Sequence, residues 1–297
     1  MKNYGLTDEE LRNFDLNGYV GPFKVYDREE IEAERYGLRM SLMDRERAAY
    51  DEQKAGNISN YDRHLDIPFL DRHIRRPQIV DRVRSILGLD LLCWRTEFFF
   101  KYPGDEGTDW HQSRNLALGS GIAPLAPKQT CPRYPEVFLT LSAWTALTDS
   151  TRANGCLQVM PGSHRELHYD DQRPMAWRPD AVNSVVKNGI KRGLFGYDSR
   201  EIQVDPAWVP NENRAVNLEL NAGEFVLMWE ATMHGSLPNT TKNITRMALA
   251  ARYVPTHVRI YPNMTVLKEY GGTADLSRWR AVLVSGEDQY QHNKLST

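Results

Sequence analysis

The chain has 297 residues, 41% of them hydrophobic and 26% charged, which is the composition of a globular protein with enough chain to bury one large core. Its formal net charge of −2 argues against a dedicated nucleic-acid-binding protein. The chain contains no run of about 18 apolar residues, so no membrane span is predicted. The first residues lack the apolar stretch of a secretory signal.

The first 90 residues are predicted to be helical. Thr7 and Glu10 have the spacing of a capping box at the start of a helix. Residues 28–55 carry apolar side chains at roughly helical intervals among many charges, which predicts a surface helix. Residues 78–88 predict a short helix that is closed by Gly88.

From residue 91 onward the pattern is typical of strands. Aromatic and β-branched residues concentrate in short segments, and turn signals such as Pro103-Gly104 and Pro161-Gly162 separate them. The predicted strand segments are residues 91–102, 136–147, 156–163, 223–234 and 246–254.

Strands that follow an N-terminal group of helices predict an α+β fold. Its core is expected to be a double-stranded β-helix, the jelly roll of cupins, because this closed double sheet protects the edges of short strands. No repeat or linker-like stretch divides the chain, so we expect a single domain over residues 1–297, with a helical part (1–90) packed on a jelly-roll core (91–297). Three cysteines (Cys93, Cys131 and Cys156) lack metal-ligand spacing, which indicates reduced thiols and a cytoplasmic protein.

The segment "DWHQSR" places His111 and Ser113 two residues apart. If it is extended, both side chains point to the same side. A His-X-Asp or His-X-Glu pair with a distant second histidine forms the facial triad of non-heme iron(II) oxygenases, and here a serine stands where the carboxylate is expected. His234, after an apolar strand, is the natural second histidine. Arg246, on the next strand, has a planar fork that suits the far carboxylate of 2-oxoglutarate.

Each of these residues alone is more simply explained by packing or surface exposure. The ordered combination of His111, His234 and Arg246 on predicted strands favours a metal site. His164 and His168 have the i, i+4 spacing of helical metal ligands, but they follow a turn and have no evident third ligand. We interpret that pair as structural or solvent-exposed.

Longer segments resemble a known family. "ALTDSTRANGCLQVMPGSHR" and "HGSLPNTTKNITRMALAARYVP" resemble the phytanoyl-CoA dioxygenase superfamily of Fe(II)/2-oxoglutarate enzymes. "CWRTEFFFKYPGDEGTDWHQ" is similar to one branch, the halogenases of syringomycin-type pathways, which act on amino acids bound to carrier proteins. The resemblance covers nearly the whole chain. It implies a jelly-roll fold and a site that uses Fe(II), 2-oxoglutarate, O2 and chloride.

The resemblance also explains the serine. In these halogenases a small residue replaces the carboxylate of the triad, and a halide takes the vacant position on the iron. His111 and His234 are then the two protein ligands. A serine hydroxyl is neutral and short, so Ser113 is expected to leave the position open, or to donate a hydrogen bond to the halide or to a water beside it.

Further roles follow from the resemblance. It implies that Arg246, with Thr108 and Trp144, binds 2-oxoglutarate, and that Arg252 and Ser142 belong to the polar shell of the halide. Phe195 is expected on the apolar substrate side. The chain departs from the branch at Leu118, where an asparagine near the halide is usual, and Asn115 is a candidate to compensate.

A carrier-bound substrate implies an acidic carrier protein as the partner, and no nucleic acid or membrane is expected. Arginines crowd one predicted helical region and are a candidate docking face, although a solvated charged face is the simpler interpretation. They are Arg72, Arg75, Arg76, Arg82 and Arg84. Two alternatives stay open: a hydroxylase of a similar substrate, in which water fills the gap at Ser113, and a binding module that has kept the fold without the chemistry.

Overall fold

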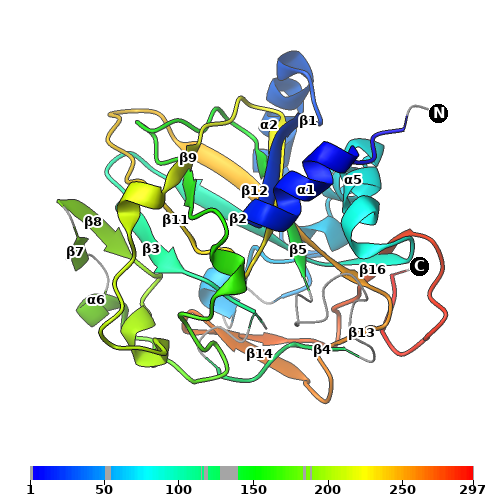
Figure 1. Cartoon of the computed structure of the whole chain (residues 1–297). Coiled ribbons are helices and arrows are strands. Elements are labelled where there is room, and N and C mark those ends of the chain that lie inside the picture. Colours follow the sequence, from blue (N-terminus) through cyan, green and yellow to red (C-terminus); the bar gives the residue numbers. More distant parts are fainter. Residues whose placement is uncertain are drawn as a thin grey trace.

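The structure is a computed structural model, and two six-stranded sheets form its core (Figure 1). It describes residues 3–50, 55–114, 116, 120–127, 140–182, 185–187 and 189–296. The major sheet has the order β1 (Tyr19–Lys24), β10 (Glu224–Trp229), β5 (Leu141–Ala146), β12 (Arg246–Pro255), β2 (Leu91–Lys101) and β16 (Val282–Ser285). The minor sheet has the order β7 (Val185–Lys187), β8 (Ile190–Gly193), β3 (Gly107–His111), β11 (His234–Ser236), β6 (Leu157–Val159) and β9 (Val216–Leu218).

Smaller elements surround these sheets. Two hairpin-like pairs are β4 (Leu125–Pro127) with β13 (Val258–Ile260), and β14 (Val266–Glu269) with β15 (Gly272–Asp275). The α-helices are α1 (Asp8–Asn17), α2 (Arg28–Met43), α4 (Pro68–Ile74), α5 (Pro77–Leu87) and α6 (Pro179–Val182). Single 3-10 turns are η1 (Gly56–Ile58), η2 (Arg63–Leu65), η3 (Ser163–Arg165), η4 (Ser199–Ile202) and η5 (Glu212–Arg214).

The alternation along β12 shows how the layers are built. Met247, Leu249 and Ala251 belong to the apolar cluster that joins the major sheet to helices α1, α2, α4 and α5. The intervening Ala248 and Ala250 belong to a second cluster, whose other members come from both sheets. Since strand side chains alternate between faces, one face of the major sheet carries the helices and the other faces the minor sheet.

The fold confirms the predicted α+β jelly roll, with one correction in the N-terminal part. Residues 19–24 are not helical: they form β1 and pair with β10 at the edge of the major sheet. The predicted capping box is present, because Thr7 accepts from the backbone of Glu10 while the Glu10 side chain accepts from the backbone of Thr7. The helix closed by Gly88 is also observed, as α5.

The surface helix predicted over residues 28–55 ends at Met43, and residues 44–50 are not helical. Residues 51–54 of that prediction lie outside the described residues. The buried guanidinium of Arg63 donates to the carbonyl oxygens of Ser41 and Leu42, at 3.0 and 3.2 Å. These last carbonyls of the helix therefore have side-chain partners and do not need another turn. No helix in the described ranges combines the length and apolar character that a membrane crossing requires.

Candidate active site

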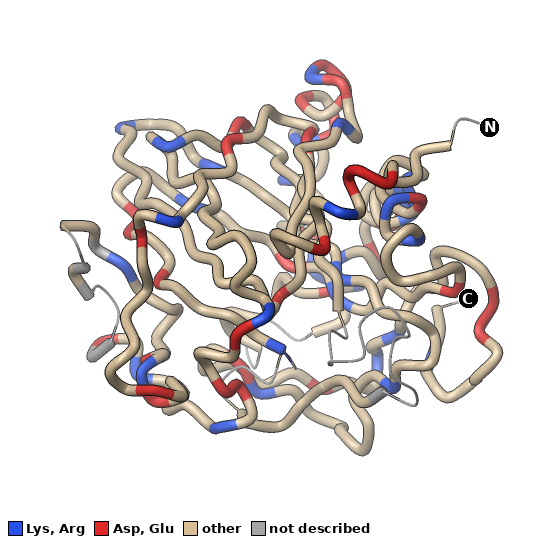
Figure 2. The backbone as a smooth tube through the Cα atoms, in the orientation of Figure 1, with Lys and Arg blue, Asp and Glu red and all other residues tan. Residues whose placement is uncertain are grey.

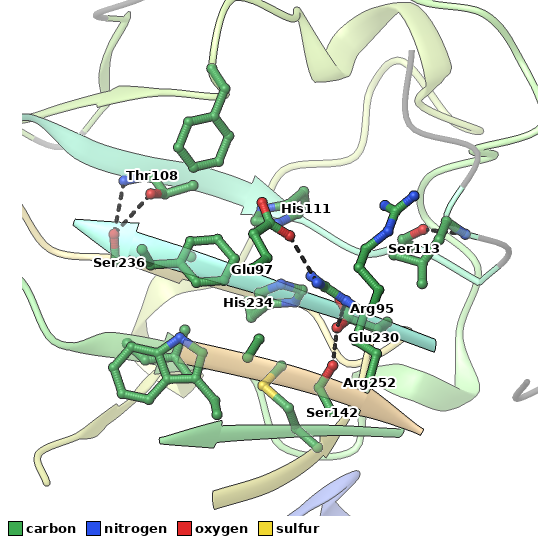
Figure 3. A pocket seen from close by; sticks show the side chains of 18 of the residues that line it. Arg95, Glu97, Thr108, His111, Ser113, Ser142, Glu230, His234, Ser236 and Arg252 are labelled. Carbon is green, nitrogen blue, oxygen red and sulfur yellow. Dashed lines mark hydrogen bonds and ion pairs between the residues drawn. The ribbon is translucent and has the colours of Figure 1, made fainter. Parts of the chain in front are cut away.

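A cavity lies between the two sheets (Figure 3). Its walls come from the inward faces of β2, β5, β10 and β12 on one side and from β3, β6 and β11 on the other. The structure brings all of the sequence-predicted site residues to this cavity: Thr108, His111, Ser113, Ser142, Trp144, Phe195, His234, Arg246 and Arg252.

His111 and His234 face each other across the ladder that joins β3 and β11. Their ring centroids are 4.1 Å apart. Nδ1 of His111 donates to the carbonyl oxygen of Asp109 at 2.8 Å, and Nδ1 of His234 donates to that of Thr232 at 2.7 Å. Burial lowers the pKa of His111 to about 3 and also lowers that of His234. Both rings are thus neutral with Nε2 deprotonated, the form that binds a metal.

Ser113 lies beside this pair, but its hydroxyl is already hydrogen-bonded. Its Oγ donates to Asp171 at 2.5 Å and accepts from the backbone of Leu116 at 2.9 Å. Its backbone N–H donates to the carbonyl oxygen of Glu230 at 2.9 Å. The expected option in which the Ser113 hydroxyl donates to a halide does not fit these bonds. Within the described residues no group of three or more His, Cys, Asp and Glu side chains is arranged to hold a metal.

Arg246 lines the cavity at the other end of β12 from Arg252. It is 4% exposed, and it makes no side-chain hydrogen bond or ion pair with any residue that the structure describes. Burial lowers its pKa to about 10, and its guanidinium carbon lies 5.4 Å from the centre of the Trp144 ring. A buried cation without a partner is unfavourable. This side chain therefore fits an anionic ligand that is absent from the protein alone.

The hydroxyl of Thr108 is oriented to donate a hydrogen bond to the same anion. Ser236 Oγ donates to Thr108 Oγ1 at 2.9 Å and accepts from the Thr108 backbone at 3.1 Å. Because the hydroxyl of Thr108 already accepts, its own proton remains available to donate. Arg246 and Thr108 can together hold a carboxylate, while the two Nε2 atoms hold a metal. The residues of the cavity fit both Fe(II) and 2-oxoglutarate.

Arg252 and Ser142 lie beside the histidines, in a buried network that sequence reasoning missed. Nε of Arg252 donates to Glu230 at 2.9 Å, and its terminal nitrogen donates to Glu97 at 2.8 Å. The hydroxyl of Ser142 also donates to Glu230. Both predicted halide donors are therefore engaged by a carboxylate (Figure 3).

A second ion pair forms the wall next to Glu97. Arg95 donates to both oxygens of Glu269 at 3.2 Å, and Tyr61 contacts Glu97 and Glu269 at 3.1 and 3.2 Å. Glu97 follows Arg95 by two positions on β2, so the sequence "RTEF" indicates two charged side chains on one face of that strand. It does not indicate their partners, which are Arg252 for Glu97 and Glu269 for Arg95. No sequence pattern marks Glu230 as a residue of the cavity, because it follows an apolar strand and belongs to no motif.

Phe195 lies at the mouth of the cavity with 44% of its surface exposed. Its ring meets that of Tyr270 edge-on, with centroids 5.5 Å apart. Both residues have positive φ angles, 52° and 50°, a conformation that is rare outside glycine and concentrates at functional sites. Leu118 and Asn115, the positions where the chain departs from the halogenase pattern, lie outside the described residues.

The other histidine pair is not a metal site. His164 is buried in η3, whereas His168 lies beyond that turn and stacks on Trp208 with ring centroids 3.9 Å apart. Cys93 and Cys156 are free and buried. The third cysteine, Cys131, lies outside the described residues.

The arginine-rich region lies on α4 and α5, where charges of both signs mix (Figure 2). None of the five arginines lines the cavity. Four of them pair with carboxylates: Arg72 with Glu34, Arg75 with Asp71, Arg76 with Glu30 and Arg84 with Asp81. Arg82 instead lies over the ring of Phe23, at 4.1 Å. This surface offers an acidic partner less unpaired positive charge than the sequence suggests.

Comparisons with known proteins agree with this chemistry. The sequence model of the phytanoyl-CoA dioxygenase (PhyH) family matches residues 14–248. The chain belongs to this family. An ectoine dioxygenase from Nocardia farcinica is 30% identical over 240 residues, which are 78% of this chain and 73% of that protein. A probable phytanoyl-CoA dioxygenase from Caenorhabditis elegans is 25% identical over 276 residues, 87% and 78% of the two chains.

Among solved structures, "CytC3 with Fe(II) and alpha-ketoglutarate" is 40% identical to this chain with a TM-score of 0.74. The similarity covers 99% of this chain and 94% of CytC3. Alpha-ketoglutarate is 2-oxoglutarate. The protein is an Fe(II)/2-oxoglutarate-dependent oxygenase of the PhyH family.

Proposed function

We propose that this enzyme is a chloride-dependent halogenase that replaces a hydrogen on an aliphatic carbon with chlorine. The balanced reaction is R–H + Cl⁻ + 2-oxoglutarate + O2 + H⁺ → R–Cl + succinate + CO2 + H2O. The observation that carries the proposal is Ser113. Two ligand-ready histidines lie in the cavity, and the residue at the carboxylate position of the triad is a short, neutral side chain whose hydroxyl is held by Asp171.

Each cofactor has residues that would hold it. His111 and His234 would bind the iron through Nε2, and Arg246 with Thr108 would bind the distal carboxylate of 2-oxoglutarate. When bound, iron, 2-oxoglutarate and O2 supply the oxidation of the C–H bond. The missing carboxylate leaves one coordination position and one negative charge to be supplied from outside, and chloride supplies both.

The charge of the cavity supports, as the substrate, an amino acid whose carboxyl group is esterified and therefore uncharged. Among the described residues, its charged lining consists of three arginines and three glutamates: Arg95, Arg246, Arg252, Glu97, Glu230 and Glu269. The charges of Fe(II) and 2-oxoglutarate cancel, so bound chloride leaves one negative charge in a low-dielectric space. A substrate with a free ammonium group and no free carboxylate would neutralise it. An aminoacyl thioester on a carrier protein has this charge.

The surroundings of the mouth support a carrier protein as partner. A second cavity shares Phe99, Phe195 and Tyr270 with the active site. It shares Asn60 and Phe100 with a surface groove beside α2. These shared lining residues make the three hollows neighbours, which supports an approach of a flexible arm from the side of α2.

Hydroxylation is the second candidate function. It is favoured by the hydrogen bonds of Arg252 and Ser142 to Glu230, which occupy donors that a halide would use. In that case water fills the position next to Ser113, and a hydroxyl group is transferred to the same carbon. The two functions therefore differ in which small ligand occupies one position.

The test needs no substrate. The protein is assembled without O2 in the presence of Fe(II) and 2-oxoglutarate, and the visible iron-to-ketoacid charge-transfer band is recorded while chloride is added. We expect a saturable shift of the band in the wild type and in Ser113→Ala. We expect none in Ser113→Asp, whose carboxylate would fill the position.

The outcomes separate the two functions. A band that forms but does not respond to chloride would overturn the halogenase and favour the hydroxylase. An equal response of wild type and Ser113→Asp would mean that chloride does not bind at the position facing residue 113, which would also contradict the proposal. Failure of the band to form at all would contradict the iron site itself.

A further inference from the structure

Glu230 is a buried carboxylate in the wall of the active site. It follows β10 directly and precedes His234 by four residues, and it is 6% exposed. Burial raises its pKa, but the charge of Arg252 and the hydrogen bonds from Arg252 and Ser142 outweigh burial and lower the pKa to about 2. The side chain is therefore an anion at neutral pH.

The position of Glu230 relates it to the open coordination position. Its carbonyl oxygen accepts from the backbone of Ser113 at 2.9 Å, so the two residues are bonded neighbours. Its carboxylate interacts electrostatically with both His111 and His234. In Figure 3, Glu230 lies next to His234 on the side of Arg252 and Ser142. An anion at this place would be close to a ligand that the iron took at the position facing Ser113.

The carboxylate of Glu230 accepts hydrogen bonds from the two nearby donors that were predicted to bind a halide. One oxygen, Oε1, accepts from both Nε of Arg252 and the hydroxyl of Ser142. A donor that is bonded to this carboxylate cannot also donate to a halide, because the hydroxyl and the Nε–H group each have a single proton to donate. The negative charge also repels a second anion, and in a buried site the repulsion is weakly screened.

We propose that Glu230 is a specificity-determining residue that competes with the halide. Its carboxylate takes the place of the halide on Arg252 and Ser142, and so it sets how readily chloride replaces water beside the iron. This inference rests on the proposed halogenase function. It predicts that removing the charge of Glu230, with its size retained, strengthens chloride binding.

Glu97 provides the matched comparison. It is bound to the same guanidinium of Arg252, is similarly buried and lines the same cavity. Unlike Glu230, it does not bond to Ser142, and its backbone does not bond to Ser113. If only the total charge near Arg252 mattered, neutralising either glutamate would have the same effect on chloride.

The experiment titrates chloride into the anaerobic Fe(II) and 2-oxoglutarate complexes of the wild type, Glu230→Gln, Glu230→Asp and Glu97→Gln. The readout is the charge-transfer band. We expect the Kd for chloride to fall about tenfold or more in Glu230→Gln, to change less than about threefold in Glu97→Gln, and to stay near the wild-type value in Glu230→Asp, which keeps the charge. Thermal denaturation and the amplitude of the band verify that each variant is folded and loaded. Glu230→Ser replaces Glu230→Gln if the latter does not load.

The outcomes keep this inference apart from the proposed function. A wild type that ignores chloride while Glu230→Gln responds would overturn the halogenase but support the competition by Glu230. A wild type that responds as well as or better than Glu230→Gln would overturn the role of Glu230 and leave the halogenase standing. Equal gains in Glu230→Gln and Glu97→Gln would also overturn it, because the effect would then be general. No response in either wild type or Glu230→Gln overturns both.

Discussion

His111 and His234 stand opposite each other on β3 and β11, and each ring is held by the carbonyl oxygen two residues before it in the chain. The acceptors are the backbone oxygens of Asp109 and Thr232. No side-chain carboxylate orients either ring through Nδ1. The backbone itself therefore fixes the tautomer and aims both Nε2 atoms.

Loss of one histidine should abolish tight iron binding, because the described part of the cavity offers the metal two side-chain ligands, His111 and His234. We expect His234→Gln to bind Fe(II) about 100-fold or more weakly than wild type, since the loss of a residue that only hydrogen-bonds to a metal ligand already costs about 10- to 100-fold. His168→Gln is the control, because His168 stacks on Trp208 away from the cavity. The measurement is the amplitude of the charge-transfer band against added Fe(II). Comparable loss in both variants would contradict the assignment.

The unpartnered guanidinium of Arg246 should lower the free energy of unfolding of the ligand-free protein, compared with a variant that has an apolar side chain at this position. Arg246→Met keeps an unbranched chain over Trp144 and removes the buried charge. We expect the free energy of unfolding without 2-oxoglutarate to rise by about 1 kcal/mol or more, while the affinity for 2-oxoglutarate falls about 100-fold. Thermal denaturation with and without 2-oxoglutarate measures both effects. The wild type should be stabilised by the ligand, and the variant should not.

Arg192 is the matched control for that prediction. It is as deeply buried as Arg246, but its guanidinium donates to the carbonyl oxygens of Thr108 and Ser236 and to Gln158. Because these acceptors would lose their partner, Arg192→Met should destabilise the protein by several kcal/mol. If both variants lost stability, the interpretation of Arg246 as a buried cation that is unpaired until an anionic ligand binds would be wrong.

Strand periodicity and the family resemblance each predict part of the site. The strand pattern places His111 and Arg246 on extended segments, whereas only the resemblance implies the role of Thr108. Arg252 follows Arg246 by six residues, so both face the cavity for a reason that the sequence contains. Their charge partners were not predictable in the same way. Glu230 lies in a turn, and nothing local indicates that its side chain reaches Arg252 on another strand.

The N-terminal region shows the same limit. The capping box and the Gly88 end are local signals, and both predictions are confirmed. The end of α2 and the strand β1 depend on distant residues: Arg63 binds the last carbonyls of the helix, and β10 supplies the ladder for β1. Tertiary bonds of this kind override the helical periodicity of residues 44–50.

Asp62 should give the stability of the protein a distinct pH dependence. Burial, the largest influence, raises its pKa to about 6, although Arg95 and hydrogen bonds from Tyr50 and Thr96 oppose the rise. The folded state therefore holds this proton more tightly than the unfolded state. The resulting stability is present below about pH 4 and is lost as the pH rises through 6, a change of about 3 kcal/mol.

The variant Asp62→Asn should remove this dependence. Asparagine tolerates the left-handed conformation of this residue, φ 56° and ψ 26°, and its oxygen can accept one of the same bonds. Urea unfolding between pH 4 and 7 measures the difference in free energy between wild type and variant. We expect the wild type to lose stability relative to Asp62→Asn over this interval, and parallel curves would contradict the assignment.

The proposed carrier protein should dock on α2 and not on the paired arginines of α4 and α5. Tyr36, Met40 and Met43 repeat at helical spacing along α2 and are 76%, 55% and 76% exposed. They line the surface groove beside α2, and Arg39 and Arg45 are the charged residues in its described lining. An apolar stripe beside positive charge suits an acidic partner with an apolar contact face.

Charge placed on the stripe should therefore weaken the use of the tethered substrate. For Met40→Glu combined with Met43→Glu, we expect kcat/KM for the aminoacyl carrier protein to fall about tenfold or more, because a like charge and lost apolar area oppose docking. The same aminoacyl group on free pantetheine reports the chemistry without docking and should lose less than about twofold. Arg84→Glu on α5 is the control and should leave both rates unchanged. A loss that is equal for the tethered and free thioesters would place the effect in the active site, and a loss confined to Arg84→Glu would move the docking face to α5.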